Sequence, residues 1–147
     1  MKIPIIILIA AVCLGGCMPK DEEVDILIKN GIVYDGLNKD PQSVSIAIKG
    51  DTITYIGNQK KVNFSSKKTI DAKGLIVAPG FIDPHTHADR ELENPRESHN
   101  KPFLYQGITT VVVGNDGSSP YPISKYAKLY EEQGIGTNVA CLVGQGT

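Results

Sequence analysis

Two hydrophobic patterns of different period divide the chain near residue 74. Between residues 24 and 73 apolar and polar residues alternate in short runs, as at Val24, Ile26 and Ile28. A period of two is typical of half-buried strands. Short strands at hairpin spacing predict a small, all-β, sandwich-like domain over residues 24–74. This segment carries no catalytic constellation, so we expect its role to be structural.

From residue 75 onward the pattern changes to strands that alternate with helices. The apolar run 75–78 predicts a buried strand, and residues 109–113 and 138–143 predict two more. Residues 123–133 have a helical period, and Gly134 is a stop signal after them. The polar stretch 89–100 is expected to be a loop. Alternating strands and helices indicate a parallel α/β layout over residues 75–147.

Charge and cysteine content narrow the classes of function. The formal net charge is −1 with no basic patch, which gives no support for nucleic-acid binding. The apolar fraction of 41% is ordinary for a globular protein. The cysteines Cys13, Cys17 and Cys141 form neither a C-x-x-C pair nor a disulfide-like framework.

The first residues have the pattern of a targeting segment. Lys2 precedes a short apolar run, and this run is too short for an uncleaved membrane span. Residues 14–17, Leu-Gly-Gly-Cys, resemble a bacterial lipobox, which implies a signal peptide over residues 1–16 and a lipid on Cys17. Residues 17–23 are then expected to be a flexible tether. The protein would be lipid-anchored in the bacterial cell envelope; an ordinary secretory signal with an incidental cysteine is the alternative.

The clearest candidate chemistry is the pair His85 and His87. Residues two apart on a strand point to the same side, so the two imidazoles are expected to project together. Two neutral imidazoles can hold a divalent cation such as Zn²⁺. Two polar residues that cap a strand end are the alternative interpretation.

Residues 79–87, Pro-Gly-Phe-Ile-Asp-Pro-His-Thr-His, resemble the first barrel strand of the amidohydrolase superfamily, whose H-x-H supplies two metal ligands. The resemblance implies that residues 75–147 form the first three strands of an incomplete (β/α)8 TIM-type barrel. Since such a barrel needs about 250 residues, we expect a longer protein, and a fragment that is inactive alone. In that family the general base is an Asp near the last strand, expected here beyond Thr147.

Two further stretches resemble the N-acyl-D-amino-acid deacylases, namely residues 106–117 and 142–147. In that family the position of Asp116 commonly holds a cysteine that binds zinc, and the position of Gln145 often holds His. A carboxylate is also a legitimate Zn²⁺ ligand and would suit Mn²⁺ or Fe²⁺. Asp116 is thus a third metal ligand, or it simply belongs to a tight Asn-Asp-Gly turn.

Five other side chains are weaker candidates. Asp83 can accept a hydrogen bond from a ligand imidazole or stabilise the end of the strand. Gln145 can line a pocket through its amide. Cys141 is expected to be a buried thiol and His99 a surface residue. Arg90 can meet a substrate carboxylate, although a solvated charge explains it equally well.

The resemblance implies metal-dependent hydrolysis of a C–N amide bond, with deacylation of N-acyl-D-amino acids by metal-activated water. The implied cofactor is one or two divalent ions, zinc in the first place. The expected partners are a small N-acyl amino acid and, through Cys17, a lipid bilayer, but no nucleic acid. Two alternatives stay open: a cyclic-amide hydrolase of the dihydropyrimidinase or dihydroorotase type, and a non-catalytic envelope lipoprotein that uses the barrel as a binding scaffold.

Overall fold

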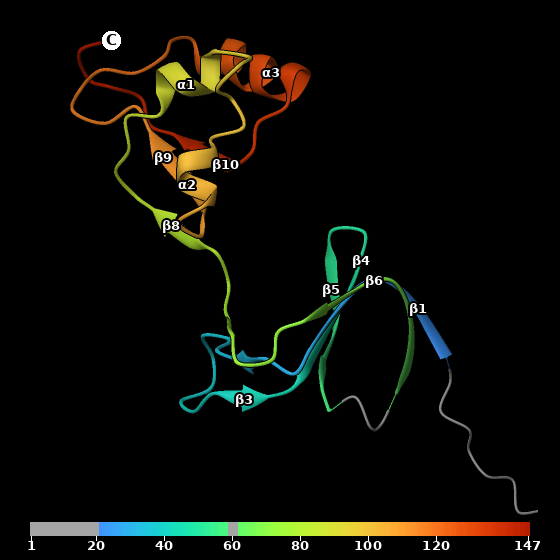
Figure 1. Cartoon of the computed structure of the whole chain (residues 1–147). Helices are drawn as coiled ribbons and strands as arrows, with labels where there is room; N and C mark the ends of the chain where they lie inside the picture. The colour runs from blue at the N-terminus through green and yellow to red at the C-terminus, as the bar shows by residue number, and fades with distance from the viewer. Residues whose placement is uncertain (1–20, 59–61) are drawn as a thin grey trace, which may run out of the picture. The chain divides into compact units, whose positions relative to one another are not determined.

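The structure is a computed structural model that describes residues 21–58 and 62–147, and it divides into two compact units (Figure 1). The units are Met1–Val77 and Ala78–Thr147, so the division comes three residues after the position that the sequence pattern predicts. The predicted signal peptide and Cys17 lie outside the described residues. Among the helices of the described part, none is long and apolar enough to cross a membrane.

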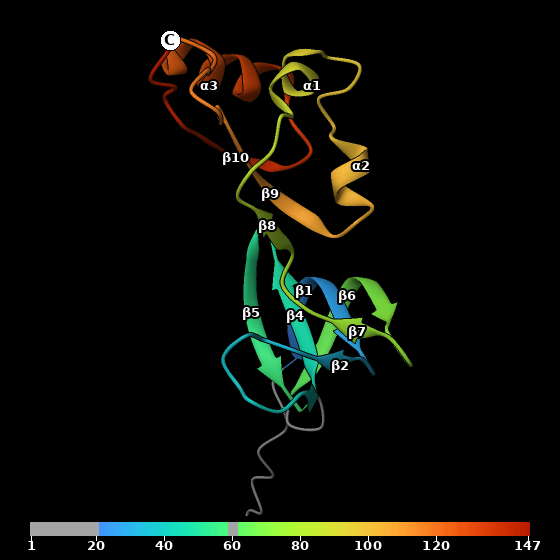
Figure 2. The ribbon, with the colours of Figure 1, turned by 90° about the vertical axis from the view of Figure 1, so that its left-hand side faces the viewer.

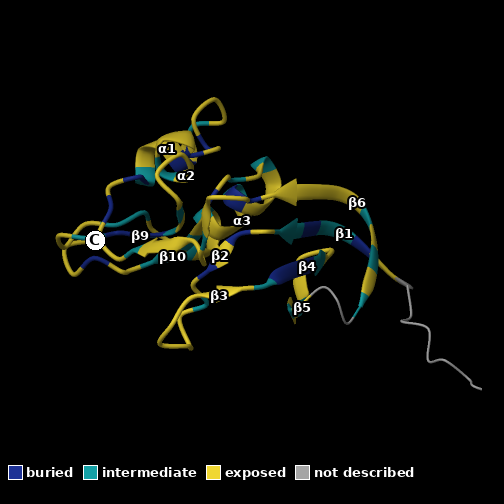
Figure 3. Cartoon of the chain, turned by 60° about the horizontal axis from the view of Figure 1, so that its bottom comes forward, coloured by how far each residue is buried: buried dark blue, intermediate teal, exposed yellow. Residues whose placement is uncertain are grey.

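The first unit is built on a sheet with the strand order β5-β4-β1-β6. Its strands are β1 (Asp21–Lys29), β4 (Ser45–Lys49), β5 (Thr52–Gly57) and β6 (Asn63–Asp71). Strand β4 is antiparallel to both β1 and β5, whereas β6 runs parallel to β1. Val24, Leu27 and Ala47 form its core on β1 and β4, where Figure 3 shows the buried segments.

A second, smaller sheet in this unit has the order β3-β2-β7, with β2 (Ile32–Val33), β3 (Gln42–Ser43) and β7 (Ile76–Val77). The Asn30-Gly31 turn connects β1 to β2, which belong to different sheets, so it does not close a hairpin. Asn30 has a φ of 64°. A Cβ at Gly31 would lie 2.6 Å from Val77 Cγ2, so only glycine allows β7 this close.

Three expectations for the first unit are wrong. Asp21–Glu23, expected in the tether, extend β1 and pair with β6. Residues 63–67 belong to a polar stretch, 57–67, whose composition predicts a loop, but they are strand because their backbone pairs with β1. Ile76 and Val77, expected in a buried barrel strand, pair with β2, and Ile76 is 69% exposed. In each case tertiary pairing outweighs the local side-chain pattern.

The second unit has a sheet of three parallel strands in the order β10-β9-β8 (Figure 2). The strands are β8 (Phe81–Asp83), β9 (Ile108–Val113) and β10 (Asn138–Cys141), and the helices are α1 (Asp89–Glu93), α2 (Lys101–Leu104) and α3 (Ile123–Gln133). Leu92, Val111, Val113 and Tyr130 are buried together in its core. The predicted parallel α/β layout is therefore present, with β9 in the centre of the sheet.

The elements of this unit agree with the sequence pattern in part. Helix α3 has the predicted bounds, and Gly134 follows it with a φ of 74°. Helix α1 lies in the stretch that was predicted to be a loop, because Leu92 is fully buried in the core. Asn100 precedes α2 but does not cap it through its side chain, since its Nδ2 donates to Thr137 Oγ1 at 3.0 Å. Strand β10 ends at Cys141, before the predicted 143.

Candidate metal centre

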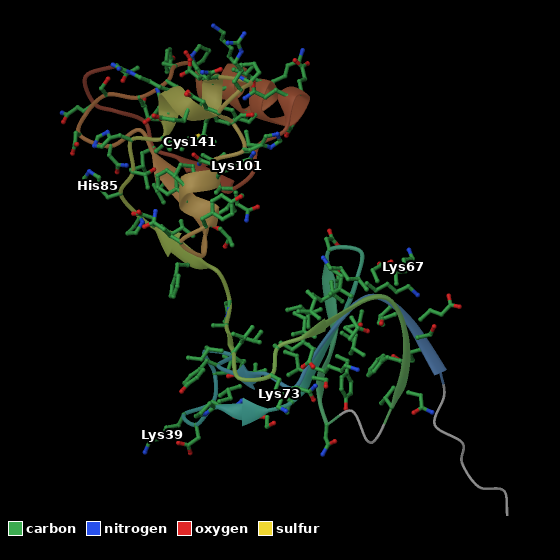
Figure 4. All side chains as sticks on the ribbon, viewed as in Figure 1. Lys39, Lys67, Lys73, His85, Lys101 and Cys141 are labelled. Atoms are coloured by element: carbon green, nitrogen blue, oxygen red, sulfur yellow. The ribbon has the colours of Figure 1, made fainter. Side chains whose placement is uncertain are left out.

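The histidine pair lies just beyond the carboxyl end of β8. The strand ends at Asp83, but the alternation of side chains continues for a few residues. His85 and His87 are exposed, whereas Thr86 between them is 4% exposed and donates its Oγ1 to Val112 O at 2.8 Å. The two imidazole centroids are 5.6 Å apart. Figure 4 labels His85 at the edge of the second unit.

Asp116 faces both histidines from the turn after β9. Its Oδ1 lies 3.4 Å from His85 Nε2, and its Oδ2 lies 3.1 Å from His87 Nε2. Parallel strands present their carboxyl ends at one edge of a sheet, where enzymes with parallel barrels place catalytic groups. The structure thus brings together the three residues that the sequence suggests as metal ligands.

The donor atoms of this cluster suit a zinc ion. One ligand atom from each of the three residues lies within 4.8 Å of the other two. Ligands about 2.0–2.1 Å from a tetrahedral Zn²⁺ lie about 3.3 Å from one another. The two distances from Asp116 to the imidazoles are close to that value. Two imidazoles and a carboxylate also match the ligand types that zinc accepts.

Asp83 lies beside the cluster, and its carboxylate contacts a backbone group of the histidine segment. Its Oδ1 accepts a hydrogen bond from the backbone N–H of His85 at 3.1 Å. Of its two suggested roles, this contact corresponds to stabilisation of the strand end. Gln145 is exposed, and its neighbour Gly146 donates its backbone N–H to Gly117 O at 2.7 Å. The segment with Gln145 therefore lies against the turn that follows Asp116.

A cleft of about 610 Å³ opens beside His87 and Asp116. Arg90 lies on its border together with three carboxylates, those of Asp89, Glu91 and Glu93. The cleft can thus bring a small polar molecule next to two of the three candidate ligands. The guanidinium of Arg90 provides a positive charge among these acidic side chains.

The other two candidates lie away from the cluster. Cys141 is half-buried on β10, and burial together with the nearby charge of Asp89 raises the pKa of its thiol. A raised pKa keeps the thiol protonated and unreactive, as expected of a structural cysteine. His99 is exposed and borders a separate shallow hollow with Lys101 and Tyr105.

Asn115 is the residue that sequence reasoning missed. Its Nδ2 donates hydrogen bonds to Thr86 O and to Val112 O, both at 3.0 Å. Asp89 adds a further link, because its Oδ1 accepts from the backbone N–H of Gly114 at 3.1 Å. The sequence showed Asn115 only as part of a turn signal, and nothing local in the sequence pairs it with Thr86.

Comparison with known proteins supports the resemblance seen in the sequence. Residues 68–132 match the model of the Amidohydrolase family. The chain is 39% identical over 100 residues to the D-aminoacylase of Alcaligenes xylosoxydans xylosoxydans, covering 68% of this chain and 20% of the relative. It is 37% identical over 116 residues to the adenine deaminase of Bacillus subtilis (strain 168), covering 79% of this chain and 18% of that protein.

A solved structure extends the similarity to three dimensions. The N-acyl-D-glutamate deacylase from Bordetella bronchiseptica, complexed with zinc and a phosphonate inhibitor that mimics the tetrahedral intermediate, matches with a TM-score of 0.74 and 30% identity. The match covers 84% of this chain and 30% of that one. The chain spans about a fifth of the length of the curated relatives it matches. All three candidate ligands lie within the residues matched by the family model, and these similarities together support an amidohydrolase, D-aminoacylase-like chain.

Proposed function

We propose that the protein hydrolyses the C–N amide bond of N-acyl-D-amino acids with the help of a divalent metal ion, zinc in the first place. The observation that carries the proposal is the convergence of His85, His87 and Asp116 after two neighbouring parallel strands. The similarity to a D-aminoacylase and to a zinc-complexed N-acyl-D-glutamate deacylase supports the same chemistry.

We infer that β8, β9 and β10 are the first strands of a (β/α)8 barrel. Three parallel strands in sequential order, with helices between them, support this inference. In such barrels the loops at the carboxyl ends of the strands carry the active site. His85, His87 and Asp116 lie at these ends, as the inference requires.

The side chains of the cluster have distinct tasks in this proposal. A bound zinc ion would supply a Lewis acid for the amide carbonyl and would lower the pKa of the water it binds to about 7. His85 and His87 would hold the ion through imidazole nitrogens, and Asp116 would contribute a negative charge that partly compensates the cation. Arg90, on the border of the cleft, is placed where a guanidinium can pair with a substrate carboxylate.

The test uses the full-length protein that contains this chain, because the fragment alone is expected to be inactive, and compares its metal content and amine release with those of a His85→Ala/His87→Ala double variant. We expect the wild type to bind zinc and to release amine from N-acyl-D-amino acids, and the double variant to lose both. His99→Ala is the matched control, because it removes an exposed histidine outside the cluster. Full metal loading without release of amine from any N-acyl-D-amino acid would contradict the proposal.

A second candidate follows from the similarity to an adenine deaminase, which extends over 79% of the chain. Deamination also breaks a C–N bond, so the same three ligands can serve it. Release of ammonia from adenine, and not of amine from N-acyl-D-amino acids, would favour this second function. Metal binding without either activity would instead favour the scaffold interpretation, and turnover of a cyclic amide the cyclic-amide hydrolase.

We also propose that Cys17 carries a lipid that anchors the protein in the bacterial cell envelope. The support is the Leu-Gly-Gly-Cys stretch and the short apolar run before it. A thioether-linked diacylglycerol together with an N-acyl chain places several acyl chains in the bilayer, which is enough for stable anchoring.

A further inference from the structure

The loop after β8 and the turn after β9 are connected by hydrogen bonds that meet at Val112 O. This carbonyl accepts from the backbone N–H of Thr86 at 3.0 Å and from Thr86 Oγ1 at 2.8 Å. It also accepts from Asn115 Nδ2 at 3.0 Å. The second contact of Asn115 Nδ2 is with Thr86 O, again at 3.0 Å. One amide group thus joins the two segments that carry the candidate ligands.

The two residues that donate in this network, Thr86 and Asn115, are each next to a candidate ligand in sequence. Thr86 separates His85 from His87, and Asn115 precedes Asp116. Thr86 is 4% exposed, so its polar atoms depend on protein partners. A displacement of the β9 turn relative to Thr86 would therefore change the separation between Asp116 and the imidazoles.

The turn itself has a backbone that needs external support. Asp116 has a φ of 59°, and Gly114 and Gly117 both have a φ of 81°. Left-handed conformations are uncommon for residues other than glycine, and glycines leave the chain free to adopt others. The hydrogen bonds of Asn115, together with the one from Gly114 N–H to Asp89 Oδ1, select one conformation from these.

We propose that Asn115 is a positioning residue that holds Asp116 opposite His85 and His87 at the separation a metal ion requires. The inference rests on the metal centre of the proposed function and adds a residue that does not itself bind the ion. The amide nitrogen Nδ2 of Asn115 has no free lone pair for a metal ion, and it already donates hydrogen bonds to two carbonyl oxygens. Partners that orient metal ligands in this way typically contribute 10–100-fold to metal affinity.

The test is a titration of the ¹⁵N-labelled chain with Zn²⁺ alone, in which the imidazole signals of His85 and His87 report the dissociation constant. Asn115→Ala should weaken zinc binding by about tenfold or more. Asn138→Ala is the matched control, because Asn138 Nδ2 also donates to a β9 carbonyl, that of Thr109 at 3.1 Å, but at the opposite end of the strand. This control should bind zinc as the wild type does.

A double-mutant cycle with Asp116→Ala separates positioning from general structural damage. If Asn115 acts through Asp116, the effect of Asn115→Ala should be much smaller in the Asp116→Ala background. Independent, multiplicative effects would overturn the proposal, as would wild-type zinc affinity of Asn115→Ala. Should Asn115→Ala lose the amide signals of β9, Asn115→Ser, which keeps a shorter donor, takes its place in the same cycle.

The zinc affinity of the wild type tests the metal centre separately from the role of Asn115. A wild-type chain that binds zinc no more tightly than His85→Ala/His87→Ala would overturn the metal centre, and the positioning role with it. A wild type that binds zinc, next to an Asn115→Ala variant of equal affinity, would overturn the role of Asn115 alone.

Discussion

At the scale of single residues, the motif predicted which candidate ligands lie together but not the contacts that hold them. His85 and His87 follow from H-x-H spacing at a strand end, and Asp116 follows from its place after the next strand. The role of Asn115 did not follow, because it depends on which backbone groups lie nearby in space. Asn115 and Thr86 are 29 positions apart, and no local pattern encodes such a hydrogen bond.

Substitutions of Asp116 test directly whether this residue is a metal ligand or serves only the turn. Asp116→Ala should weaken Zn²⁺ binding to His85 and His87, whereas a residue that serves only the turn should leave binding unchanged. Asp116→Cys should bind Zn²⁺ more tightly and discriminate more strongly against Mn²⁺, because a thiolate is a softer ligand than a carboxylate. The φ of 59° opposes this gain, since aspartate tolerates left-handed backbone better than most residues. Parallel Zn²⁺ and Mn²⁺ titrations of the three proteins measure both effects.

At the scale of elements, the period of apolar residues predicted the elements that bury one face. It failed for the elements whose structure depends on backbone pairing with a distant strand. Helix α3 was predicted with correct bounds because its apolar face follows the helical period. The first part of strand β6, residues 63–67, was missed because its backbone pairing with β1, and not burial of its side chains, makes it a strand. Helix α1 was missed because the stretch is mainly polar, and Leu92 is the one residue of this helix that is buried in the core.

Leu92 should therefore contribute far more to stability than a leucine on another short helix. Leu92→Ala creates a cavity at a fully buried position and should lower the free energy of unfolding of the second unit by about 2–5 kcal/mol. Leu104→Ala on α2 is the matched control, because Leu104 is 37% exposed and should cost less than about 1 kcal/mol. Amide hydrogen exchange on β9 measures both changes. Equal effects of the two substitutions would show that α1 is not held by Leu92.

The main sheet of the first unit should lose stability in acid. The carboxylate of Asp25 accepts a hydrogen bond from Gly50 N–H at 2.6 Å and another from Lys67 Nζ at 2.6 Å. Both contacts lower the pKa of this carboxyl from its ordinary value of 3.8, and the contact with Gly50 has the larger effect. A lowered pKa stabilises the folded state above about pH 3.8, and this contribution is lost as the pH falls through the lowered value. Thermal unfolding between pH 5 and pH 2 should therefore show a smaller decline for Asp25→Asn than for the wild type, with Asp40→Asn as an exposed control.

At the scale of the whole molecule, the structure divides into two compact units whose elements differ in kind. Alternation of period two marks the β unit, and the change to alternating strands and helices marks the α/β unit. The division was predicted too early because Ile76 and Val77 are apolar, like a buried strand, yet pair with β2. Apolar composition alone does not say which sheet a strand joins, since that depends on the neighbouring backbone.

The proposed anchor concerns the location of the entire protein and can be tested in cells. Wild type should fractionate with membranes and incorporate labelled fatty acid, whereas Cys17→Ala should do neither, because the lipid is attached through the Cys17 thiol. Cys13→Ala is the matched control, since it removes a cysteine four positions earlier, within the predicted signal peptide, and should leave both properties unchanged. Membrane retention of Cys17→Ala without fatty-acid labelling of the wild type would contradict lipidation, because some other contact would then hold the protein at the membrane.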